Sequence, residues 1–532
     1  MSLRKRVKDV ARERLSPDTK RRIRKLERAL LKQMGSTRYT RSARAQAAFE
    51  AGDYEESAGL LTASLEKSPK DANALGLASR VAMRRGAVSD SATFAGKRAM
   101  ESGRPRDLLD ARLIAGRLRE TEEHWRPMVA APNPEPWTGD RVVYLAKESR
   151  PFLHNGFCTR THESLQSLVR AGRDVVGVTM PGFPSVIGID NPSNESVVED
   201  VVYRHLLPRG GKILSKLAFD EYIDLSTQAL AGFVAKERPS LLHIGSGHRG
   251  FETALAGDAV ARWAGIPWIY EVRSFFETTW TSDVRYMEQG EYYERRFTTE
   301  TRMMKASNLV LTLSGPMRDE IADTHGIPAE KIRVIPNAVD LTRFAPEQRD
   351  QDLHTRLGLG SSFTIGYVSN VSHPREGQEV LVEAVALLRG HGREVTGLIV
   401  GDGSRREELG KLARKLGVAD SVVFTGNVPF DQVSAYYAQI DLFVVPRVNE
   451  RAARMVSPMK PFEAMAMEIP VMVADLPALV EIAGSGERAH TFRTGEPASL
   501  AAETAKLMDS PQELRRLTEA AGDWVRRERS WS

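Results

Sequence analysis

The chain has 532 residues, 41% of them hydrophobic and 27% charged, a composition typical of proteins that fold around packed cores. This length exceeds what one hydrophobic core supports and predicts roughly two to four domains. The single cysteine, Cys158, excludes a disulfide framework within the chain. Because the sequence has neither an apolar run long enough to span a membrane nor the apolar core of a signal peptide, we expect a cytoplasmic protein.

The N-terminal segment, residues 1–36, is strongly basic. Its first 32 residues hold 13 Lys or Arg against 4 Asp or Glu, whereas the whole chain has a net charge of +5, so the remainder is net acidic. Apolar residues at helical spacing predict two short basic helices that break at Ser16 and Pro17. Such helices suit an anionic membrane surface, which would place the protein peripherally at the inner face of the membrane. The alternatives are a solvated tail or a contact with nucleic acid. We do not expect nucleic acid as a partner.

Residues 37–130 form a predicted helical region in which two positions recur. Gly86 follows Gly52 by 34 residues, and Ser91 follows Ser57 by the same interval. A period of 34 with glycine at the helix–helix turn is the tetratricopeptide spacing, and the region resembles such repeats. The helices either present a surface to a protein partner or form a spacer packed on the next domain, and the sequence favours neither.

After a proline-rich linker, residues 138–336 alternate short apolar strands with helices. This alternation predicts a parallel sheet that helices cover on both faces. Ligands of such sheets bind at the loops that follow the carboxyl ends of the strands. The candidate ligand loops are residues 154–161, 245–249 and 273–280.

Residues 337–532 repeat the pattern. The apolar strands expected here are residues 363–368, 396–400, 421–424, 442–445 and 471–473. The chain is therefore predicted to be an all-α region followed by two Rossmann-like α/β domains, with a ligand cleft between the two domains.

A short helix near the end of this second pattern has the chemistry of an anion site. Pro461 fits the first helical position, where its missing N–H costs nothing, and the helix is expected over residues 462–468. The free N–H groups of its first turn would favour an anion, and Lys460 adds a positive charge. The carboxylate of Glu463 suits sugar hydroxyls. An ordinary strand–loop–helix with a solvated Lys and Glu explains the same residues equally well.

Four stretches of the second half carry a family resemblance. Residues 334–344, 400–403, 423–428 and 445–474 are similar to motifs of the retaining glycosyltransferases of family 4. They occur in the order and spacing of that family, and the resemblance extends from about Gly139 to the C-terminus. It implies the GT-B fold, with an acceptor domain at 138–336 and a nucleotide-sugar donor domain at 337–532.

Three positions depart from the family pattern. Asn370 stands where relatives carry Arg, Glu376 where they carry Lys, and Met455 where they carry Glu. A subgroup with an acidic residue at the second of these positions has the string Pro-x-Lys-Pro-x-Glu-Ala-Met-Ala, which this chain has at 458–466. We therefore expect a rearranged diphosphate clamp. Its expected cations are catalytic Lys460, catalytic Arg375 and the donor contact Arg447.

The resemblance also implies a reaction and further site residues. A sugar would pass with retention from a nucleotide sugar to a glycan, lipid-linked or other acceptor, in cell-surface polysaccharide or glycoconjugate synthesis. Positive potential would stabilise the charge that grows on the leaving diphosphate, and no cofactor or metal is expected. Glu463 would bind the ribose hydroxyls, and Asn427 and Val428 the base. The other expected donor contacts are Gly156, Asn370, Gly403, Ser457 and Phe462. The expected acceptor-side residues are His154, Glu271 and Arg273.

Two other functions compete with this one. The first is a non-catalytic GT-B scaffold that recruits partners through its helical repeats. The second is a sugar-nucleotide epimerase of the same architecture, which would need an acidic pair in the cleft that the sequence does not offer.

Overall fold

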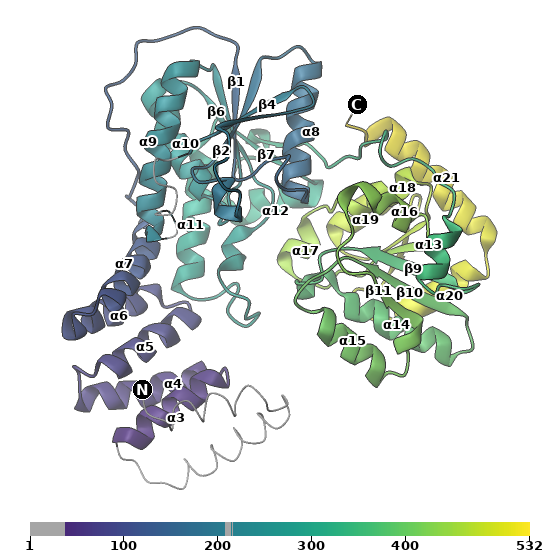
Figure 1. Ribbon diagram of the computed structural model, residues 1–532, viewed down its shortest axis with the longest axis horizontal. Coiled ribbons are helices and arrows are strands. Elements are labelled where there is room, and N and C mark those ends of the chain that lie inside the picture. Colours follow the sequence, from purple (N-terminus) through teal and green to yellow (C-terminus); the bar gives the residue numbers. More distant parts are fainter. Residues whose placement is uncertain (1–37, 208–213, 215, 532) are drawn as a thin grey trace. The chain divides into compact units, whose positions relative to one another are not determined.

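The computed structural model describes residues 38–207, 214 and 216–531 (Figure 1). The chain divides into two compact units. One holds residues 1–128, 210–225 and 276–300, and the other holds residues 129–209, 226–275 and 301–532. The first contains the helical region, and the second contains two separate β-sheets. This arrangement confirms the predicted fold class, two Rossmann-like domains preceded by an all-α region.

Two helices of the helical region, α4 and α5, begin at aspartate N-caps. Asp53 accepts the N–H of Glu56 at 3.1 Å, and Asp71 accepts the N–H of Asn73 at 3.1 Å, so each aspartate satisfies a free donor at a helix start. The apolar faces meet in a core that includes Leu61, Leu77 and Val81. The helices are α3 (Arg38–Glu50), α4 (Tyr54–Lys67), α5 (Ala72–Arg84), α6 (Val88–Ser102) and α7 (Pro105–Arg119).

The helix pairs repeat at the interval seen in the sequence. Gly52 and Gly86 have φ of +77° and +78° in the turns between α3 and α4 and between α5 and α6, a conformation that glycine adopts without steric cost. Ser57 and Ser91 each donate through Oγ to the backbone carbonyl 12 residues earlier, at 2.8 and 2.9 Å. The interval of 34 residues is therefore a structural repeat of one helix pair.

The first sheet has the strand order β3-β4-β2-β1-β5-β6-β7-β8 and is parallel except for β3. Its central strand β1 is almost fully buried, and Val143 pairs with Val176 on one side and Leu242 on the other. Helices α8 and α10 lie on opposite sides of the sheet (Figure 1). The strands are β1 (Val142–Ala146), β2 (Val175–Thr179), β3 (Glu195–Val198), β4 (Val201–His205), β5 (Leu241–Gly245), β6 (Trp268–Glu271), β7 (Leu309–Thr312) and β8 (Ile332–Val334). The helices are α8 (Gly156–Arg170), α9 (Phe219–Glu237), α10 (Glu252–Ala264), α11 (Glu291–Ala306) and α12 (Gly315–His325), with 3-10 turns η1 (Ser185–Ile187), η3 (Phe276–Trp280) and η4 (Ala329–Lys331).

The second sheet is fully parallel, with the order β11-β10-β9-β12-β13-β14. Its strands are runs of apolar residues because helices bury both faces. They are β9 (Phe363–Val368), β10 (Val395–Val400), β11 (Val422–Phe424), β12 (Leu442–Val445), β13 (Val471–Ala474) and β14 (His490–Phe492). The helices are α13 (Gln351–Arg356), α14 (Gln378–Gly390), α15 (Arg406–Lys415), α16 (Val433–Tyr437), α17 (Arg451–Met455), α18 (Lys460–Ala466), α19 (Pro477–Ala483), α20 (Pro497–Met508) and α21 (Pro511–Glu528), with 3-10 turns η5 (Pro374–Glu376), η6 (Ala419–Ser421) and η7 (Phe430–Gln432).

Each sheet has one point at which the strand order reverses. In the first sheet β1 lies between β2 and β5, and in the second β9 lies between β10 and β12. Ligands of open α/β sheets bind in the crevice that forms at the carboxyl ends of the strands at such a point. The loops after β9 and β12 are therefore the first place to look for a ligand site.

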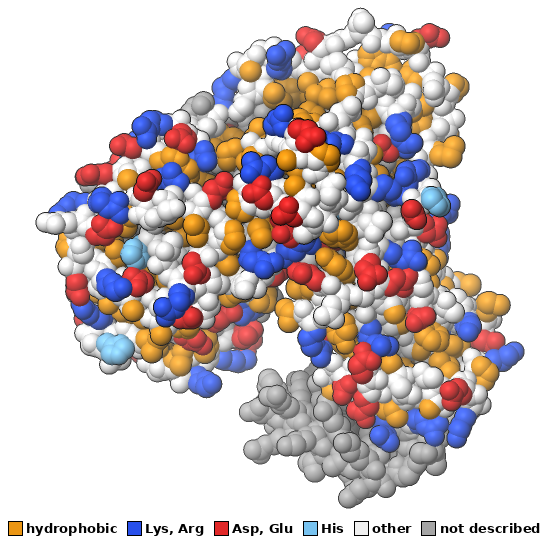
Figure 2. All heavy atoms as spheres, turned by 180° about the vertical axis from the view of Figure 1, so that it is seen from behind, with side chains coloured by type: hydrophobic (Ala, Val, Ile, Leu, Met, Phe, Trp, Pro, Cys, Tyr) orange, Lys and Arg blue, Asp and Glu red, His pale blue; other side chains and the backbone are white. Residues whose placement is uncertain are grey.

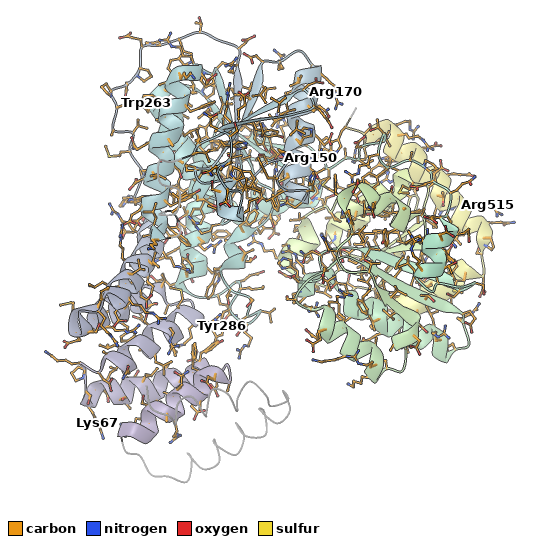
Figure 3. All side chains as sticks on the ribbon, in the orientation of Figure 1. Lys67, Arg150, Arg170, Trp263, Tyr286 and Arg515 are labelled. Carbon is orange, nitrogen blue, oxygen red and sulfur yellow. The ribbon has the colours of Figure 1, made fainter. Side chains whose placement is uncertain are left out.

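Within the described ranges no helix is long and apolar enough to cross a membrane. The face of the molecule in Figure 2 mixes Lys and Arg with Asp and Glu, and Figure 3 shows the side chains that fill the space between helices and sheets. The basic segment 1–36, with its predicted membrane contact, lies outside the described residues.

Candidate functional site

The helix α18 begins at Lys460 and ends at Ala466, two residues earlier at each end than the sequence predicts. Its first turn is already hydrogen-bonded, since the N–H groups of Phe462 and Glu463 donate to the carbonyl of Met459 at 3.0 and 3.4 Å. The expectation of free amides at these two positions is therefore wrong. The first turn tightens into shorter-range bonds, which satisfies donors that a longer helix start would leave open. Phe462 is 1% exposed and packs against Trp524, so its side chain belongs to the core.

The side chains of α18 give the site its charge. Lys460 Nζ lies 3.2 Å from Glu463 Oε2, and the Tyr437 hydroxyl donates to the same oxygen at 2.7 Å. Burial, with Glu463 beside it, raises the pKa of Tyr437 well above its usual value, so this hydroxyl keeps its proton and remains a donor. The carboxylate of Glu463 is thus held in one orientation, while the side chain of Lys460 is 37% exposed and has room to turn to a ligand.

A buried ion pair occupies the crevice between β9 and β12. Arg447, just after β12, places its guanidinium 3.2 and 3.3 Å from the two carboxylate oxygens of Glu376, and it also donates to the carbonyl of Val456 at 3.0 Å. The Tyr367 hydroxyl donates to Glu376 at 2.5 Å. Burial by itself would raise the pKa of Glu376, but Arg447 and then Tyr367 hold that pKa below its usual value.

The ion pair between Arg447 and Glu376 determines which of the predicted cations are available to a ligand. Glu376 takes the place of a lysine in relatives, and its negative charge is cancelled by Arg447, so Arg447 is not a spare cation. Arg375 is more available, because its side chain is 28% exposed and its Nε lies 3.6 Å from Glu376. Sequence reasoning missed the pairing and the part of Tyr367. The detectable signal was an acidic residue after one strand and an arginine after the next strand of the sheet.

The loops after β9 and β10 pack backbone against backbone. A Cβ on Gly401 would lie 2.0 Å from the carbonyl oxygen of Ser369, and one on Gly403 would lie 2.3 Å from the carbonyl carbon of Val371. Only glycine permits this approach. The exposed Asn370 accepts the N–H of Ser372 at 2.7 Å, so its side chain fixes the loop. Beyond β11, Asn427 is exposed and Val428 is half-buried.

The predicted acceptor-side residues Glu271 and Arg273 lie in a buried network. Arg160 donates to Glu271 at 2.6 Å, Arg273 donates to it at 2.9 Å, and His243 lies 3.2 Å away. Burial opposes the charge of Glu271, but Arg273 and then Arg160 hold its pKa well below the usual value. Glu271 and Arg273 are 1% and 5% exposed, so both support the site from beneath its surface. Sequence reasoning missed Arg160, which lies on helix α8.

Hydrogen bonds connect this network to the loop that precedes α18. Arg160 donates through Nη1 to Asn337 Oδ1 at 3.0 Å, and Asn337 Nδ2 donates to the carbonyl of Ser457 at 2.8 Å. All three residues are nearly fully buried. The loop that carries Ser457 is therefore fixed by residues from the end of the first sheet, within the same compact unit.

The loop before α8 reaches the same place. A Cβ on Gly156 would meet the Met459 sulfur at 3.7 Å, and the ring of His154 stacks on Phe430 with centroids 4.9 Å apart. Burial, followed by Arg150 and Arg343, lowers the pKa of His154, which therefore favours the neutral form. The structure thus brings Gly156 to the start of α18 and His154 to η7, while Asn427 and Val428 follow β11 at the edge of the second sheet.

The arrangement suits an anion next to a polyhydroxyl group. It offers a partly exposed ammonium group, an oriented carboxylate, close-packed glycine loops and a partly exposed arginine. Among the residues that the structure describes, no group of three or more His, Cys, Asp or Glu side chains could hold a metal ion. The expected absence of a metal remains a prediction.

Comparison with known families identifies this architecture. Residues 362–510 match the family described as "Glycosyl transferases group 1", and residues 155–338 match "Glycosyl transferase 4-like domain". Together the matches span more than half of the chain. The chain is a GT-B glycosyltransferase. It belongs with the family 4-like enzymes that its motifs resemble.

Two curated relatives are similar to parts of the glycosyltransferase. It is 27% identical over 277 residues to 2-deoxystreptamine glucosyltransferase of Streptomyces kanamyceticus, covering 51% of this chain and 69% of that one. It is 37% identical over 149 residues to a GDP-mannose-dependent alpha-(1-6)-phosphatidylinositol monomannoside mannosyltransferase of Mycobacterium tuberculosis, covering 27% of this chain and 37% of that one. The chain thus spans little more than a third of this second relative.

Among solved structures, the sucrose-phosphate synthase of Thermosynechococcus elongatus superposes with a TM-score of 0.60 at 18% identity. The match covers 74% of the glycosyltransferase and 96% of that chain. At this identity the likeness shows the fold alone.

Proposed function

We propose that the protein transfers a hexose from a nucleotide sugar to a glycan, lipid-linked or other acceptor, with retention, in the synthesis of cell-surface polysaccharide or glycoconjugate. The observation that carries this proposal is the arrangement of Lys460, Glu463 and Tyr437 on the crevice side of the second sheet. The names of the relatives support it, since one is a glucosyltransferase and the other a GDP-mannose-dependent mannosyltransferase that acts on a phosphatidylinositol monomannoside.

Lys460 is the proposed catalytic cation. In the free protein it pairs with Glu463, and its partly exposed side chain can turn towards the diphosphate of a bound donor. As the bond to the sugar breaks, negative charge grows on the leaving diphosphate, and a preplaced cation stabilises that charge most. Arg375 is the proposed second cation. Arg447 contributes by neutralising Glu376, whose charge would otherwise repel the diphosphate.

Glu463 is proposed to bind the ribose. Tyr437 occupies one of its oxygens, which leaves acceptor capacity for two sugar hydroxyls once Lys460 has turned away. The backbones of Asn427 and Val428 are proposed to contact the base. We further propose that the reaction needs no metal, so donor turnover should be the same in a chelator as in added magnesium.

Two variants and a matched control test the site. The Lys506–Glu503 pair has the same three-residue spacing in the same domain, at 2.7 Å on helix α20. With the donor found by a panel of nucleotide sugars, Lys460→Ala should lower turnover roughly 100-fold or more, because an interaction with the transition-state charge is lost. Glu463→Ala should weaken nucleotide binding about tenfold, since a charged hydrogen bond is removed. Lys506→Ala should change neither quantity.

Calorimetric titration with nucleoside diphosphates separates the rivals. If the wild-type protein binds no nucleotide, the chain is a scaffold and the proposed activity is wrong. If nucleotide binds equally well to wild type and to both site variants, the donor site lies elsewhere.

A further inference from the structure

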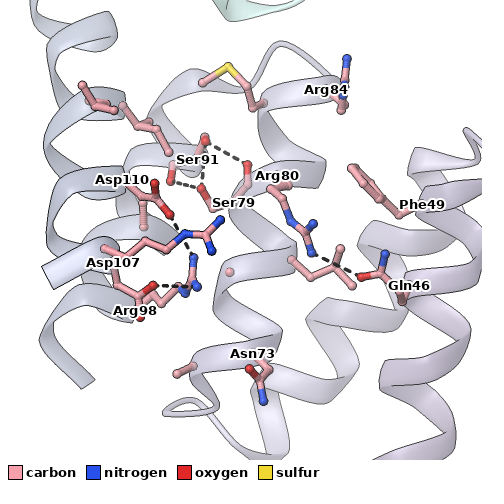
Figure 4. A pocket seen from close by; sticks show the side chains of 18 of the residues that line it. Gln46, Phe49, Asn73, Ser79, Arg80, Arg84, Ser91, Arg98, Asp107 and Asp110 are labelled. Atoms are coloured by element: carbon pink, nitrogen blue, oxygen red, sulfur yellow. Dashed lines mark hydrogen bonds and ion pairs between the residues drawn. The ribbon is translucent and has the colours of Figure 1, made fainter. Parts of the chain in front are cut away.

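The helical region contains a groove that the proposed transferase site does not use. It has a volume of about 1060 Å³ and is lined by residues of α3, α5, α6 and α7 together with Trp280 and Thr281. Small residues such as Ala43, Ala72 and Gly76 form parts of its wall and leave it open. All of these residues belong to one compact unit (Figure 4).

Arginines dominate the charge of this groove. Five arginines and two aspartates line it. The charge of Arg98 is compensated within the groove, because its guanidinium lies 2.7 Å from Asp107 and 3.5 Å from Asp110. The remaining arginines are Arg80, Arg84, Arg106 and Arg117. Within the described chain none of these four has a carboxylate at ion-pairing distance, and only Arg84 interacts with a more distant one, Asp283, so the groove keeps a net positive charge.

Two of the arginines stand four residues apart on the same helix. Arg80 and Arg84 lie on one face of α5, where like charges at this spacing destabilise the helix. Both side chains are exposed. Arg80 is placed over the ring of Phe49, 5.3 Å from its centroid, and donates to the neutral amide of Gln46 at 3.3 Å (Figure 4). An anion bound near these two arginines would reduce the repulsion.

The other lining groups decide what kind of anion fits. The amides of Gln46 and Asn73 and the hydroxyl of Ser42 suit hydroxyl groups, which both donate and accept hydrogen bonds. The half-buried ring of Trp280 offers a flat surface to a sugar ring. We propose that this groove binds a glycan chain that carries repeated acidic groups. This proposal rests on the proposed function in one respect, since the glycan is taken to be the acceptor or product of the transferase.

A glycan that binds both in the groove and at the transferase site would stay bound to the enzyme while it is extended. A long anionic glycan held in the groove by its arginines remains near the protein after each transfer. Its free end then meets the transferase site at a high effective concentration. An acceptor that occupies the transferase site alone gains nothing from the groove. The groove should therefore affect the KM for long acceptors alone.

Fluorescence anisotropy on the full-length protein provides the test, with labelled oligogalacturonate as the anionic probe and dextran oligomers of equal length as the neutral one. Oligogalacturonate should bind, more weakly at high salt, and dextran should not. Arg80→Gln with Arg84→Gln should weaken the binding about tenfold, because two charge-assisted contacts are lost. Arg106→Gln, at another exposed position, should weaken it as well.

Charge-matched control variants distinguish the groove from general attraction. Lys67, at the end of α4 (Figure 3), and Lys97 are exposed lysines of the same region that do not line the groove. Lys67→Gln with Lys97→Gln should leave oligogalacturonate binding unchanged. An equal loss in this control, or no binding of oligogalacturonate to wild type, would overturn the proposal.

Two further measurements separate the groove from its rivals. An oligoglutamate peptide of equal length that binds more tightly than oligogalacturonate would overturn the proposal in favour of an acidic protein segment. Nucleotide binding and donor hydrolysis should be unchanged in the Arg80/Arg84 variant. If wild type binds oligogalacturonate in the groove but turns over no donor, the groove is supported and only the proposed transferase activity fails.

Discussion

Glu376 and Arg447 show how one acidic residue changes the role of the arginine beside it. A glutamate in place of a lysine removes one positive charge from the crevice and adds a negative one. The structure compensates by burying Arg447 against it, with Tyr367 as a second donor. The net charge of the pair is zero, so Lys460 and Arg375 are the cations left for the proposed diphosphate contact.

Breaking this pair should be costly. Arg447→Ala leaves the buried carboxylate of Glu376 without its counter-charge, and we expect a loss of about 3–5 kcal/mol in the free energy of unfolding. The exposed pair Arg393–Asp509 has contacts of 2.6 Å and serves as the control, for which Arg393→Ala should have little effect. Urea unfolding monitored by circular dichroism measures both. Similar losses in the two variants would contradict the role assigned to burial.

A histidine makes stability depend on pH. Burial lowers the pKa of His205 to about 4, and its ring nitrogens lie 3.0 Å from Thr179 Oγ1 and 2.9 Å from Ser196 Oγ. In the unfolded chain a histidine has a pKa of about 6.5. The unfolded state therefore binds more protons between these values, and stability falls as the pH drops from about 6.5 towards 4.

Replacement of His205 should reduce the loss of stability at low pH. Between pH 7 and 4.5, wild type should lose about 1–2 kcal/mol more unfolding free energy than His205→Gln. The exposed His391 provides the control variant His391→Gln. Urea titrations at a series of pH values measure the difference, and parallel curves for wild type and His205→Gln would show that His205 does not titrate with folding.

At the scale of elements, the two ends of helix α14 show where the backbone requires glycine and where it does not. Gly377 has a φ of +67°, and a Cβ there would lie 1.9 Å from the carbonyl oxygen of Pro446. The loop after β9 therefore touches the loop after β12 through backbone atoms, next to Arg447. Gly390, at the other end of the helix, has no atom within 4 Å of where a Cβ would be.

Two alanine substitutions should accordingly behave in opposite ways. Gly377→Ala should cost at least about 2 kcal/mol of unfolding free energy and weaken nucleotide binding, because the two loops must separate. Gly390→Ala should leave stability unchanged or raise it by up to about 1 kcal/mol, since alanine favours the helix. Thermal unfolding and calorimetric titration of the two variants check this. Equal behaviour would mean that the loops do not depend on close contact.

At the scale of the whole molecule, charge separates the N-terminal segment from the rest. Residues 1–36 have a strong excess of Lys and Arg over Asp and Glu, whereas the rest of the chain is net acidic. We propose that this segment holds the enzyme at an anionic membrane surface on the cytoplasmic side. Deletion of residues 1–36 should lower co-sedimentation with anionic liposomes, because each well-placed Lys or Arg contributes about 1 kcal/mol. Neutral liposomes are the control, and equal sedimentation of both proteins with anionic liposomes would exclude the membrane role.

The sequence alone determined the order of the elements and the family. Alternating apolar strands and helices predicted both sheets, and the 34-residue interval predicted the helix pairs that the glycines and serines build. These features follow from local periodicity and spacing, which can be read directly from the sequence. The sequence also predicted the short helix that carries Lys460 and Glu463, because Pro461 marks a helix start.

Only the tertiary structure decided which charges remain available. Arg447 and Glu376 are 71 residues apart and meet because β9 and β12 are neighbours in the sheet. Arg160 reaches Glu271 across 111 residues, and Arg98 is neutralised while Arg80 and Arg84 are not. Charge and hydrogen bonding act through space over a few ångströms, and a sequence pattern does not contain those distances. The roles of these arginines, in the crevice and in the groove, are therefore properties of the fold.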